Sequence, residues 1–303
     1  MKKEKVNRSP LFYVGDKYKL ISEIKSHFPA TINRFIEPFV GGGSVYLNVK
    51  ASKYLLNDID ESVIGIHKFL CSYIGKENKF YDLVFSIIHK YKLSCSYEKD
   101  IVPTELKQRY KKTYYAHFNK ENFNRLKSDY NNSKEQNIAE LYVLLIYGFN
   151  RMLRFNGNKS YNLPVGNVDF NVNVYNALSD YFKLNTTKKT SWFCLDFKQF
   201  LSSIKFQKDD FIYLDPPYLI TFSEYNKLWD MQTEKDLLQT LDNLNKKNIN
   251  FAISNVTHYK GQENSLFIDW SKQYNSYQVT SNYISYHDNT IKDFREVLVT
   301  NYK

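Results

Sequence analysis

Apolar and polar residues in the N-terminal part of the chain follow a pattern that predicts strands and helices in turn. Residues 33–39 (NRFIEPF) predict a short buried strand, and the segment that begins at Ser44 predicts a helix with Val45 on its apolar side. A second predicted strand covers residues 53–58 and leads into a helix with apolar residues at helical spacing. This order of elements predicts a parallel sheet with helices on its faces.

The pattern changes between residues 76 and 189, where amphipathic helices are predicted, most clearly at 104–130 and 136–149. A polar, turn-rich segment follows (NRMLRFNGNKSYNLPVGN), so we expect an inserted, mostly helical region that carries a hairpin-like loop. Strands return after residue 190. They are predicted at 191–195, 210–214, 248–254, 276–286 and 295–302, with a helix at about 233–246.

Composition narrows the class of protein. Lys and Arg number 42 against 32 Asp and Glu, a formal charge of +10, so a polyanion such as nucleic acid is the expected partner. The hydrophobic fraction of 43% fits a globular chain, and no apolar run predicts a membrane span or a signal peptide. Three cysteines without a CxxC pair fit the reducing cytoplasm. The basic surplus at residues 99–134 fits either DNA contact or a solvated helix face.

The tetrapeptide Asp215-Pro216-Pro217-Tyr218 directly follows a predicted strand. A proline turn that merely ends the strand is one explanation, because proline cannot continue the ladder. The residues also suit methylation of an exocyclic amine on a nucleobase. A carboxylate oxygen of Asp215 and the Pro216 carbonyl oxygen would accept the amine hydrogens and oppose the positive charge that develops on nitrogen. The Tyr218 ring would stack on the base, so we predict catalytic roles for these three residues, without a metal ion.

Residues 39–43 (FVGGG) form the first predicted turn from strand to helix. Glycines there let the backbone approach a nucleotide-like ligand, although a tight turn alone would also explain them. No Gly-Lys-Ser/Thr follows, which excludes a P-loop. Asp58 follows the second strand, where an acid binds ribose hydroxyls in a doubly wound fold. The alternative is that Asp58 or Asp60 caps the next helix.

In this order of motifs, the chain resembles the Dam family of DNA adenine-N6 methyltransferases. The segments that carry the resemblance are SPLFYVGDKYKL, FIEPFVGGGSVYLN, LLNDID, FNRMLRFNGNKSYNLPVG, CLDF, FIYLDPPY, FAISN and REVLVTNY, and they span most of the chain. The resemblance implies a Rossmann-like, seven-stranded α/β methyltransferase sheet with an inserted, mostly helical DNA-recognition domain. It implies that residues 1–75 and 190–303 form a catalytic domain that binds S-adenosylmethionine and that residues 76–189 recognise the target.

The resemblance also implies which residues bind the methyl donor: Tyr13, Lys17, Glu37, Phe39, Gly41, Gly43, Asp58, Asp196 and Phe197. The segment 37–43 would surround the methionine part of the donor, with Tyr13 and Lys17 nearby. Asp58 would bind the ribose, and Asp196 and Phe197 would lie at the adenine. No metal ion is implied.

The loop FNRMLRFN would read DNA in a member of this family. Arg154 lies at the position whose guanidinium recognises a guanine, and Asn150 and Asn156 flank it as further DNA contacts. Family members specific for GATC have a base-reading Lys just before the aromatic residue of the first motif, whereas this chain has Phe12. The resemblance thus implies a short site, GATC or a related sequence, and Phe12 departs from the pattern of the GATC-specific members.

These observations predict a site-specific DNA adenine-N6 methyltransferase that acts on a flipped adenine in a short duplex site. Cytosine N4 or an adenine in RNA are alternative acceptors, and a DNA-binding relative without catalysis is an alternative of another class. The histidines form no recognisable metal-ligand set, which disfavours a nuclease. The expected partners are double-stranded DNA and, as an open possibility, a cognate restriction endonuclease; the expected location is the cytoplasm, on DNA.

Overall fold

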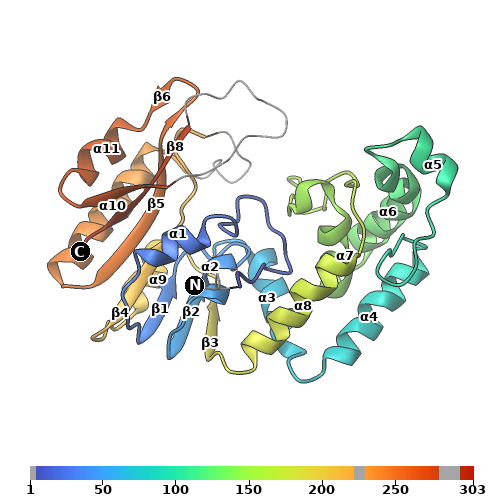
Figure 1. Cartoon of the computed structure of the whole chain (residues 1–303), viewed down its shortest axis with the longest axis horizontal. Coiled ribbons are helices and arrows are strands. Elements are labelled where there is room, and N and C mark those ends of the chain that lie inside the picture. Colours follow the sequence, from blue (N-terminus) through green and yellow to red (C-terminus); the bar gives the residue numbers. More distant parts are fainter. Residues whose placement is uncertain (1–4, 222–228, 280–293) are drawn as a thin grey trace. The chain divides into compact units, whose positions relative to one another are not determined.

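The computed structural model describes residues 5–221, 229–279 and 294–303, which form two compact units (Figure 1). We name them by content. The sheet unit consists of the described residues of 17–40, 48–59 and 188–303, and the helical unit consists of those of 1–16, 41–47 and 60–187. The assignment of one part of the chain to donor binding and another to target recognition stays a prediction.

The sheet unit contains all the named strands. They are β1 (Arg34–Glu37), β2 (Lys53–Asn57), β3 (Thr190–Phe193), β4 (Asp210–Leu214), β5 (Asn250–Tyr259), β6 (Gln262–Glu263), β7 (Asn275–Val279) and β8 (Phe294–Thr300). Their order is β3-β2-β1-β4-β5-β8-β7, with β6 paired to β5. β1 to β5 are parallel, and β8 runs antiparallel between β5 and β7. The predicted α/β fold with a mostly parallel sheet is therefore confirmed.

The sheet order places a switch point between β1 and β4, because the chain builds outward from β1 first to one side and then to the other. In open α/β sheets, ligands bind beyond the carboxyl ends of the strands at such a point. The segments that follow β1 and β4 are the glycine turn and the Asp215 tetrapeptide. The topology therefore directs the search for a site to these two segments.

Alternating side chains of the central strands pack on opposite faces of the sheet. Ile36 and Ile212 join a buried cluster with residues of α9 (Phe197–Ser203), α10 (Met231–Lys246) and α11 (Ser265–Ser271). On the other face, the ring of Phe28, just after α1 (Ile21–Ser26), lies 4.7 Å from Phe211 and 5.4 Å from Tyr213 between ring centroids. A strand buried on both faces reads as a continuous apolar run, as FIYL does.

The helical unit is built around α7 (Ile138–Tyr147), which packs against α3, α4 and α6. Its other helices are α2 (Ser44–Asn48, with Asn48 in the sheet unit), α3 (Glu61–Ser72), α4 (Glu77–Lys90), α5 (Thr104–Arg109), α6 (Tyr114–Asn132), the 3-10 helix η1 (Phe149–Arg151) and α8 (Val172–Asn185). Every α7 residue from Leu141 to Tyr147 is buried. A helix that is apolar on all sides belongs in the centre of a bundle.

Two details of the helical unit bear on the sequence predictions. The stretch 104–130, predicted as continuous helix, is divided into α5 and α6, and at the break the Tyr110 ring stacks 3.5 Å from the His117 ring. The predicted hairpin-like loop after α7 is present, with antiparallel bridges between Gly148 and Val165 and between Phe155 and Tyr161. Part of the strand predicted at 276–286 lies outside the described residues.

Candidate active site

Asp215 lies at the carboxyl edge of the sheet because β4 must end there. All five residues of β4 are buried, and β4 pairs with β1 and β5 on its two sides. Pro216 and Pro217 have no backbone N–H, so they cannot extend the ladder. The Asp215 side chain, which is 20% exposed, therefore projects from the end of a fixed central strand.

Asp215 belongs to a compact group of four side chains, which we call the Asp215 cluster: Lys17, Asp215, Tyr218 and Glu296. Lys17 Nζ lies 2.9 Å from Asp215 Oδ2 and 3.5 Å from Glu296 Oε1. The Tyr218 hydroxyl donates to Asp215 Oδ1 at 2.7 Å and to Glu296 Oε1 at 3.3 Å. Lys17 Nζ also lies 5.2 Å from the centroid of the Tyr218 ring. The cluster thus holds two carboxylates, one ammonium and one hydroxyl, all from the sheet unit.

Burial and charge determine the protonation states in this cluster. Lys17 and Glu296 are 4% and 1% exposed. Burial opposes the charge of Lys17, but the attraction of Asp215 and its neighbours outweighs it, so the pKa of Lys17 lies well above its ordinary value. Burial raises the pKa of Glu296, and Lys17 opposes that rise while Asp215 adds to it. By formal charge, two carboxylates and one ammonium give the cluster a net charge of −1.

The Pro216 carbonyl is a second acceptor beside Asp215. Pro216 is buried, and no described residue donates a hydrogen bond to its carbonyl oxygen. Each oxygen of Asp215 accepts one bond within the cluster, and a carboxylate oxygen has room for a second. The corner that follows β4 therefore holds two acceptors with hydrogen-bonding capacity that the described residues do not use.

Asn57, at the end of β2, connects the segments that follow β1 and β3. Its amide nitrogen donates to the carbonyls of Pro38 and Leu195, both at 2.9 Å, and its amide oxygen accepts from the Leu195 N–H at 3.0 Å. The residue is 1% exposed. Because a single buried amide is bonded to both segments, Phe39, Asp58 and Asp196, which directly follow these bonded positions, are held along one edge of the sheet.

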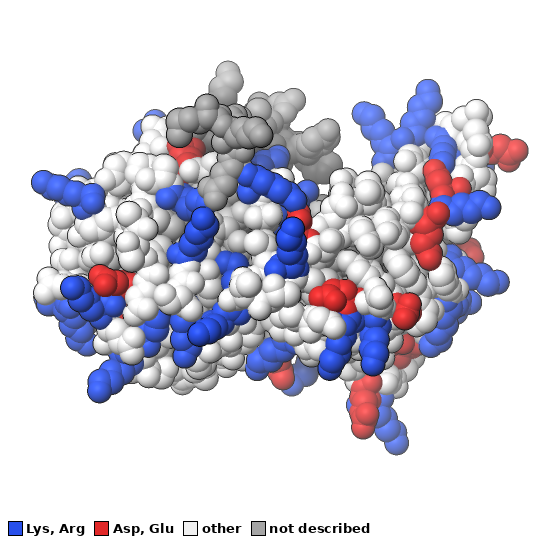
Figure 2. All heavy atoms as spheres, turned by 60° about the horizontal axis from the view of Figure 1, so that its bottom comes forward, with Lys and Arg blue, Asp and Glu red and all other residues white. Residues whose placement is uncertain are grey.

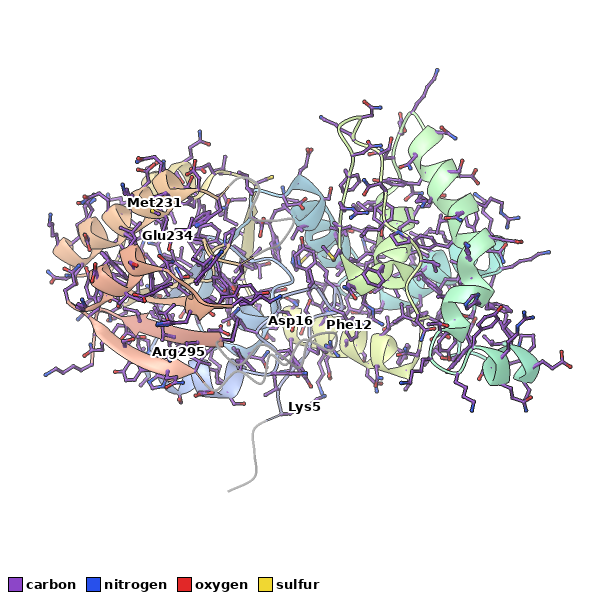
Figure 3. All side chains as sticks on the ribbon, turned by 90° about the horizontal axis from the view of Figure 1, so that it is seen from above. Lys5, Phe12, Asp16, Met231, Glu234 and Arg295 are labelled. Carbon is purple, nitrogen blue, oxygen red and sulfur yellow. The ribbon has the colours of Figure 1, made fainter. Side chains whose placement is uncertain are left out.

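Three aromatic rings pack together at the same edge. Phe39 lies 5.5 Å from Phe197 and 5.6 Å from Trp229, and Phe197 lies 5.8 Å from Trp229, between ring centroids. The Trp229 indole N–H donates at 2.6 Å to the buried carboxylate of Glu234 on α10. Glu234 is labelled in Figure 3. The amide of Asn255, in the motif FAISN, donates to the same carboxylate at 2.9 Å. The buried Glu234 carboxylate therefore fixes the orientation of the Trp229 ring, against which Phe39 and Phe197 pack.

The acids predicted to bind the donor occupy different environments. Glu37, at the end of β1, is 2% exposed. Asp58 follows β2 and is partly exposed, and Asp60 rather than Asp58 caps α3 by accepting from the Ser62 and Val63 N–H groups. Asp196 caps α9 through its bond from the Lys198 N–H at 2.9 Å. Asp196 therefore has a structural role as the cap of α9, and the cap of α3 is Asp60.

The glycine turn and Tyr13 belong to the helical unit. A Cβ atom on Gly42 would lie 2.7 Å from the Cβ of Tyr13, so only glycine permits this approach. Gly43 has a φ of 78°, in the left-handed region. The His67 imidazole lies 2.9 Å from the Gly41 carbonyl through Nε2, and burial lowers the pKa of His67 to about 4. A neutral imidazole therefore supports the turn.

The residues predicted to contact DNA lie in η1 and the hairpin-like loop. Asn150 is exposed and has a φ of 54°. Arg154 Nε donates to the Asn162 amide oxygen at 2.8 Å, across the hairpin. The Asn156 side chain accepts from the Asn158 and Ser160 N–H groups, both at 3.0 Å, and so shapes the hairpin tip.

Glu296 is the functional candidate that the sequence analysis missed. It lies in REVLVTNY, which we used only for its resemblance. On β8 the alternate residues 296, 298 and 300 are all 1% exposed or less. A charged residue among the buried, alternate positions of a strand needs a partner of opposite charge. Glu296 at such a position of the predicted strand was therefore the signal in the sequence that could have identified it. The partner itself, Lys17, is 279 positions away and could not be identified from spacing.

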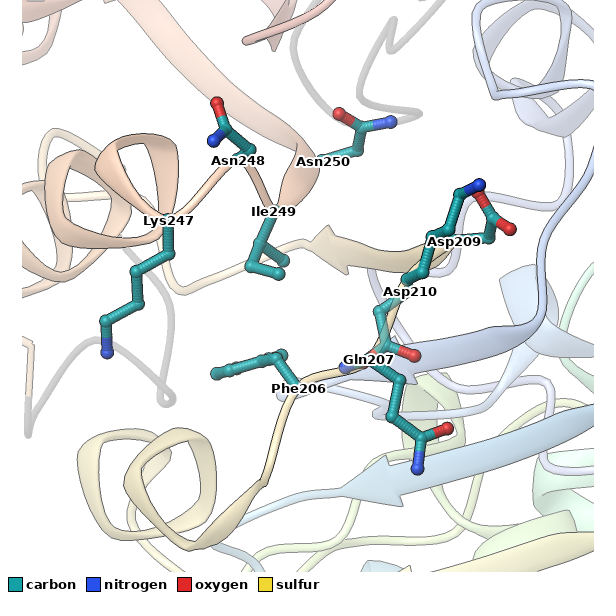
Figure 4. A pocket seen from close by; sticks show the side chains of 9 residues that line it. Phe206, Gln207, Asp209, Asp210, Lys247, Asn248, Ile249 and Asn250 are labelled. Carbon is teal, nitrogen blue, oxygen red and sulfur yellow. The ribbon is translucent and has the colours of Figure 1, made fainter.

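A hollow of about 370 Å³ lies at the other end of the strands (Figure 4). It is lined by residues 206–210 and 247–250, at the amino ends of β4 and β5. Asp210 begins β4 and Asp215 follows it, so the length of the strand separates this hollow from the Asp215 cluster. Within the described part of the chain, no three His, Cys, Asp or Glu residues are grouped to hold a metal ion, and no helix could span a membrane.

The chain is similar in sequence to known proteins. A sequence profile of the family described as D12 class N6 adenine-specific DNA methyltransferase matches residues 13–284. The chain is 34% identical, over 97% of its length, to the type II methyltransferase M.FokI of Planomicrobium okeanokoites, and 34% identical, over 99%, to the modification methylase StsI of Streptococcus sanguinis. It spans 43% and 44% of the lengths of those two relatives. A protein of Vibrio cholerae named DNA adenine methylase is 27% identical over 71% of the chain and 66% of its own length.

Proposed function

Because the chain belongs to the D12 class of N6 adenine-specific DNA methyltransferases, we propose that it transfers a methyl group to the N6 amine of an adenine in a short duplex DNA site. The methyl donor in this proposal is S-adenosylmethionine, which supplies a methyl group on a positively charged sulfur. The main support is the Asp215 cluster at the switch point of the sheet, followed by the Pro216 carbonyl, to which no described residue donates a hydrogen bond.

The carboxyl edge of the sheet unit has the chemistry that the donor requires. The partly exposed Asp58 carboxylate suits ribose hydroxyls, and the partly exposed ring of Phe39, packed against the buried ring of Phe197, suits the flat face of an adenine. Glu37 and Asp196 are the acids proposed for the rest of the donor, with Lys17 beside the reacting atoms. For the helical unit, we propose that Tyr13, Gly41 and Gly43 contact the methionine part.

Asp215 and Pro216 activate the amine. Their oxygens accept its two hydrogens, which raises electron density on a nitrogen whose lone pair is otherwise delocalised into the base. When the methyl group arrives, its positive charge passes to that nitrogen, beside the carboxylate of Asp215. The net charge of −1 in the Asp215 cluster stabilises this charge in a partly buried site, where electrostatic interactions are strong. The proton lost from nitrogen afterwards passes to solvent.

Tyr218 positions the base. Its hydroxyl is bonded to both carboxylates, and Lys17 lies over its ring, so the ring has little freedom to rotate. A fixed ring gives a flat surface on which an adenine, extruded from the duplex, stacks with its amine toward Asp215. Asn150, Arg154 and Asn156 are the proposed DNA contacts of the helical unit, and a cognate restriction endonuclease is the proposed biological partner.

The test compares Asp215→Asn with the wild-type chain and with Asp209→Asn, a control at the opposite end of β4. Loss of the Asp215 charge should slow transfer by at least about 100-fold, because one preorganised group at a developing charge is worth that much. Donor affinity, measured by calorimetry, should change by less than about threefold. The control should keep both values. Full transfer by Asp215→Asn would contradict the proposal.

The acceptor is tested in the same experiment by offering duplex DNA and RNA and identifying the methylated base by mass spectrometry. We expect N6-methyladenine in duplex DNA. Methylation of cytosine N4 or of RNA adenine would assign the chain to another substrate. DNA binding without any methylation would identify a relative that lacks catalysis.

A further inference from the structure

Arg8, Phe12 and Arg151 form a cluster in the helical unit that the proposed catalytic steps do not use. The Arg8 guanidinium carbon lies 4.5 Å, and that of Arg151 4.1 Å, from the centroid of the Phe12 ring. Phe12, labelled in Figure 3, is 6% exposed, and Arg8 is exposed. One buried ring therefore stacks with two cations, each a favourable cation–π contact but with repulsion between them.

The backbone of this cluster is held in an uncommon conformation. Phe12, Asn150 and Arg151 have φ angles of 48°, 54° and 50°, in the left-handed region that residues with a Cβ seldom adopt. Each such residue costs on the order of 1 kcal/mol, and such strain is concentrated at functional sites. The surrounding structure thus fixes the backbone of Arg151, and with it the position of the Arg151 Cα and Cβ atoms.

The guanidinium of Arg151 has hydrogen-bonding capacity that the described residues do not use. No described carboxylate pairs with it, and its buried Nε has no hydrogen-bond partner there. Burial, and then the charge of Arg8, lowers the pKa of Arg151 to about 10. Arg34 and Arg154 differ, since Arg34 pairs with Asp210 and Arg154 bonds to Asn162. An acceptor is therefore missing at Arg151.

The structure favours a base edge over a phosphate as that acceptor. A phosphate is neutralised well by an exposed cation such as Arg8. Arg151 is instead pinned by an aromatic ring, and a planar fork held in one orientation suits two acceptors at fixed positions in one plane. Guanine presents such a pair, O6 and N7, in the major groove.

We propose that Arg151, held against Phe12, is a specificity-determining residue that binds the O6 and N7 edge of a guanine in the recognised DNA site. This rests on the proposed function, because DNA must be the substrate. Arg8 neutralises a phosphate near that guanine. The position is distinct from Arg154, which the sequence analysis assigned to a guanine.

The experiment selects bound duplexes from a randomised pool with the wild-type chain, Arg151→Lys and Arg8→Gln, and sequences them. Lysine keeps the charge of Arg151 but not its planar fork. We expect Arg151→Lys to lose discrimination for guanine at one position of the site by about 5- to 150-fold, while other positions keep theirs. Arg8→Gln should weaken binding of all sequences alike and reduce the salt dependence by about one phosphate contact.

Phe12→Leu provides a second variant that keeps both arginines and removes only the ring. It should lose part of the same discrimination, and thermal unfolding will show whether each variant is folded. An unchanged selected sequence with Arg151→Lys, together with a reduced salt dependence, would identify a phosphate contact and overturn the inference. Methylation of the selected duplexes is assayed separately, so a wild-type chain that binds a guanine-containing site without methylating it would contradict the proposed function alone.

Discussion

Glu296 shows how one buried side chain shapes the charge of the Asp215 cluster. It shares Lys17 with Asp215 and accepts from the Tyr218 hydroxyl, so it fixes both side chains that contact Asp215. Its other oxygen, Oε2, is buried and has no hydrogen-bond partner among the described residues. Burial of an incompletely bonded carboxylate costs stability, and a functional reason is needed to explain it.

Replacement of Glu296 by glutamine should therefore slow methyl transfer and leave the fold intact. The net charge of the cluster would change from −1 to zero, and a charge several ångströms from the reacting nitrogen is worth about 10- to 100-fold in rate at an effective dielectric constant of about 20. The free energy of unfolding should stay equal or rise, because a neutral amide is easier to bury. Single-turnover transfer and chemical denaturation measure the two quantities.

The dependence of the transfer rate on pH shows whether Glu296 acts through its charge or through its shape. Because the pKa of Glu296 is raised, the wild-type rate should fall as the pH drops through that raised value, where an ordinary glutamate would still be ionised. Glu296→Gln should lack this part of the profile. Glu263→Gln, an exposed site on β6, is the matched control and should behave as the wild type. A wild-type rate with Glu296→Gln at every pH would remove Glu296 from the mechanism.

Among the elements, the carboxyl ends of β1, β2 and β3 are held together by the side-chain amide of Asn57. Asn57→Ala would remove three hydrogen bonds to Pro38 and Leu195, each worth about 1 kcal/mol. The segments that carry Phe39, Asp58 and Asp196 would then be free to shift. We expect donor affinity to fall by about 10- to 100-fold, whereas the rate at saturating donor should fall much less.

The control for this prediction is Asn275→Ala, which removes a bond to the Tyr302 carbonyl at the opposite edge of the sheet. Donor titrations of both variants, with unfolding curves, separate a local effect from general destabilisation. Equal losses of donor affinity in the two variants would contradict the role of Asn57.

The strands illustrate how far sequence patterns reach. β4 occupies the predicted residues 210–214, and β1 and β2 differ from prediction by one or two residues at their ends, because a buried apolar run followed by a turn is a strong local signal. β5 extends to Tyr259, five residues beyond the predicted end, because pairing with β8 supports it there. That pairing joins residues far apart in sequence and leaves no local pattern.

The same distinction applies to the site. Asp215, Pro216 and Tyr218 lie within one tetrapeptide. Their common position at the end of a strand therefore followed from a single motif. Lys17 was assigned to the donor, and its ion pair with Asp215 was not predicted, because it depends on how the segment before α1 lies against β4. The Phe12 stack was likewise hidden, since Phe12 and Arg151 are separated by most of the helical unit.

At the scale of the whole molecule, the sequence carries a surplus of positive charge. Figure 2 shows Lys and Arg side chains at several separate places on one face, with fewer acidic side chains among them. With a formal charge of +10, the chain should be attracted to DNA of any sequence at low salt. Specific binding then depends on the few side chains that reach base edges.

We therefore expect the affinity for duplex DNA of unrelated sequence to fall at least about tenfold between 50 and 200 mM salt, as phosphate contacts release counterions. Fluorescence anisotropy at several salt concentrations measures this. The advantage of the recognised site over unrelated DNA should widen as salt rises, because hydrogen bonds to bases are screened less than contacts to phosphates. An affinity independent of salt would contradict the assumed electrostatic attraction.

The position of β8 between β5 and β7 has a consequence for synthesis on the ribosome. Lys17 emerges early, Asp215 much later, and Glu296 only after the two strands that flank β8. A nascent chain that lacks residue 296 has an exposed edge on β5 and an incomplete set of charges around Asp215. Methylating activity should therefore arise only once β8 has left the exit tunnel and inserted into the sheet.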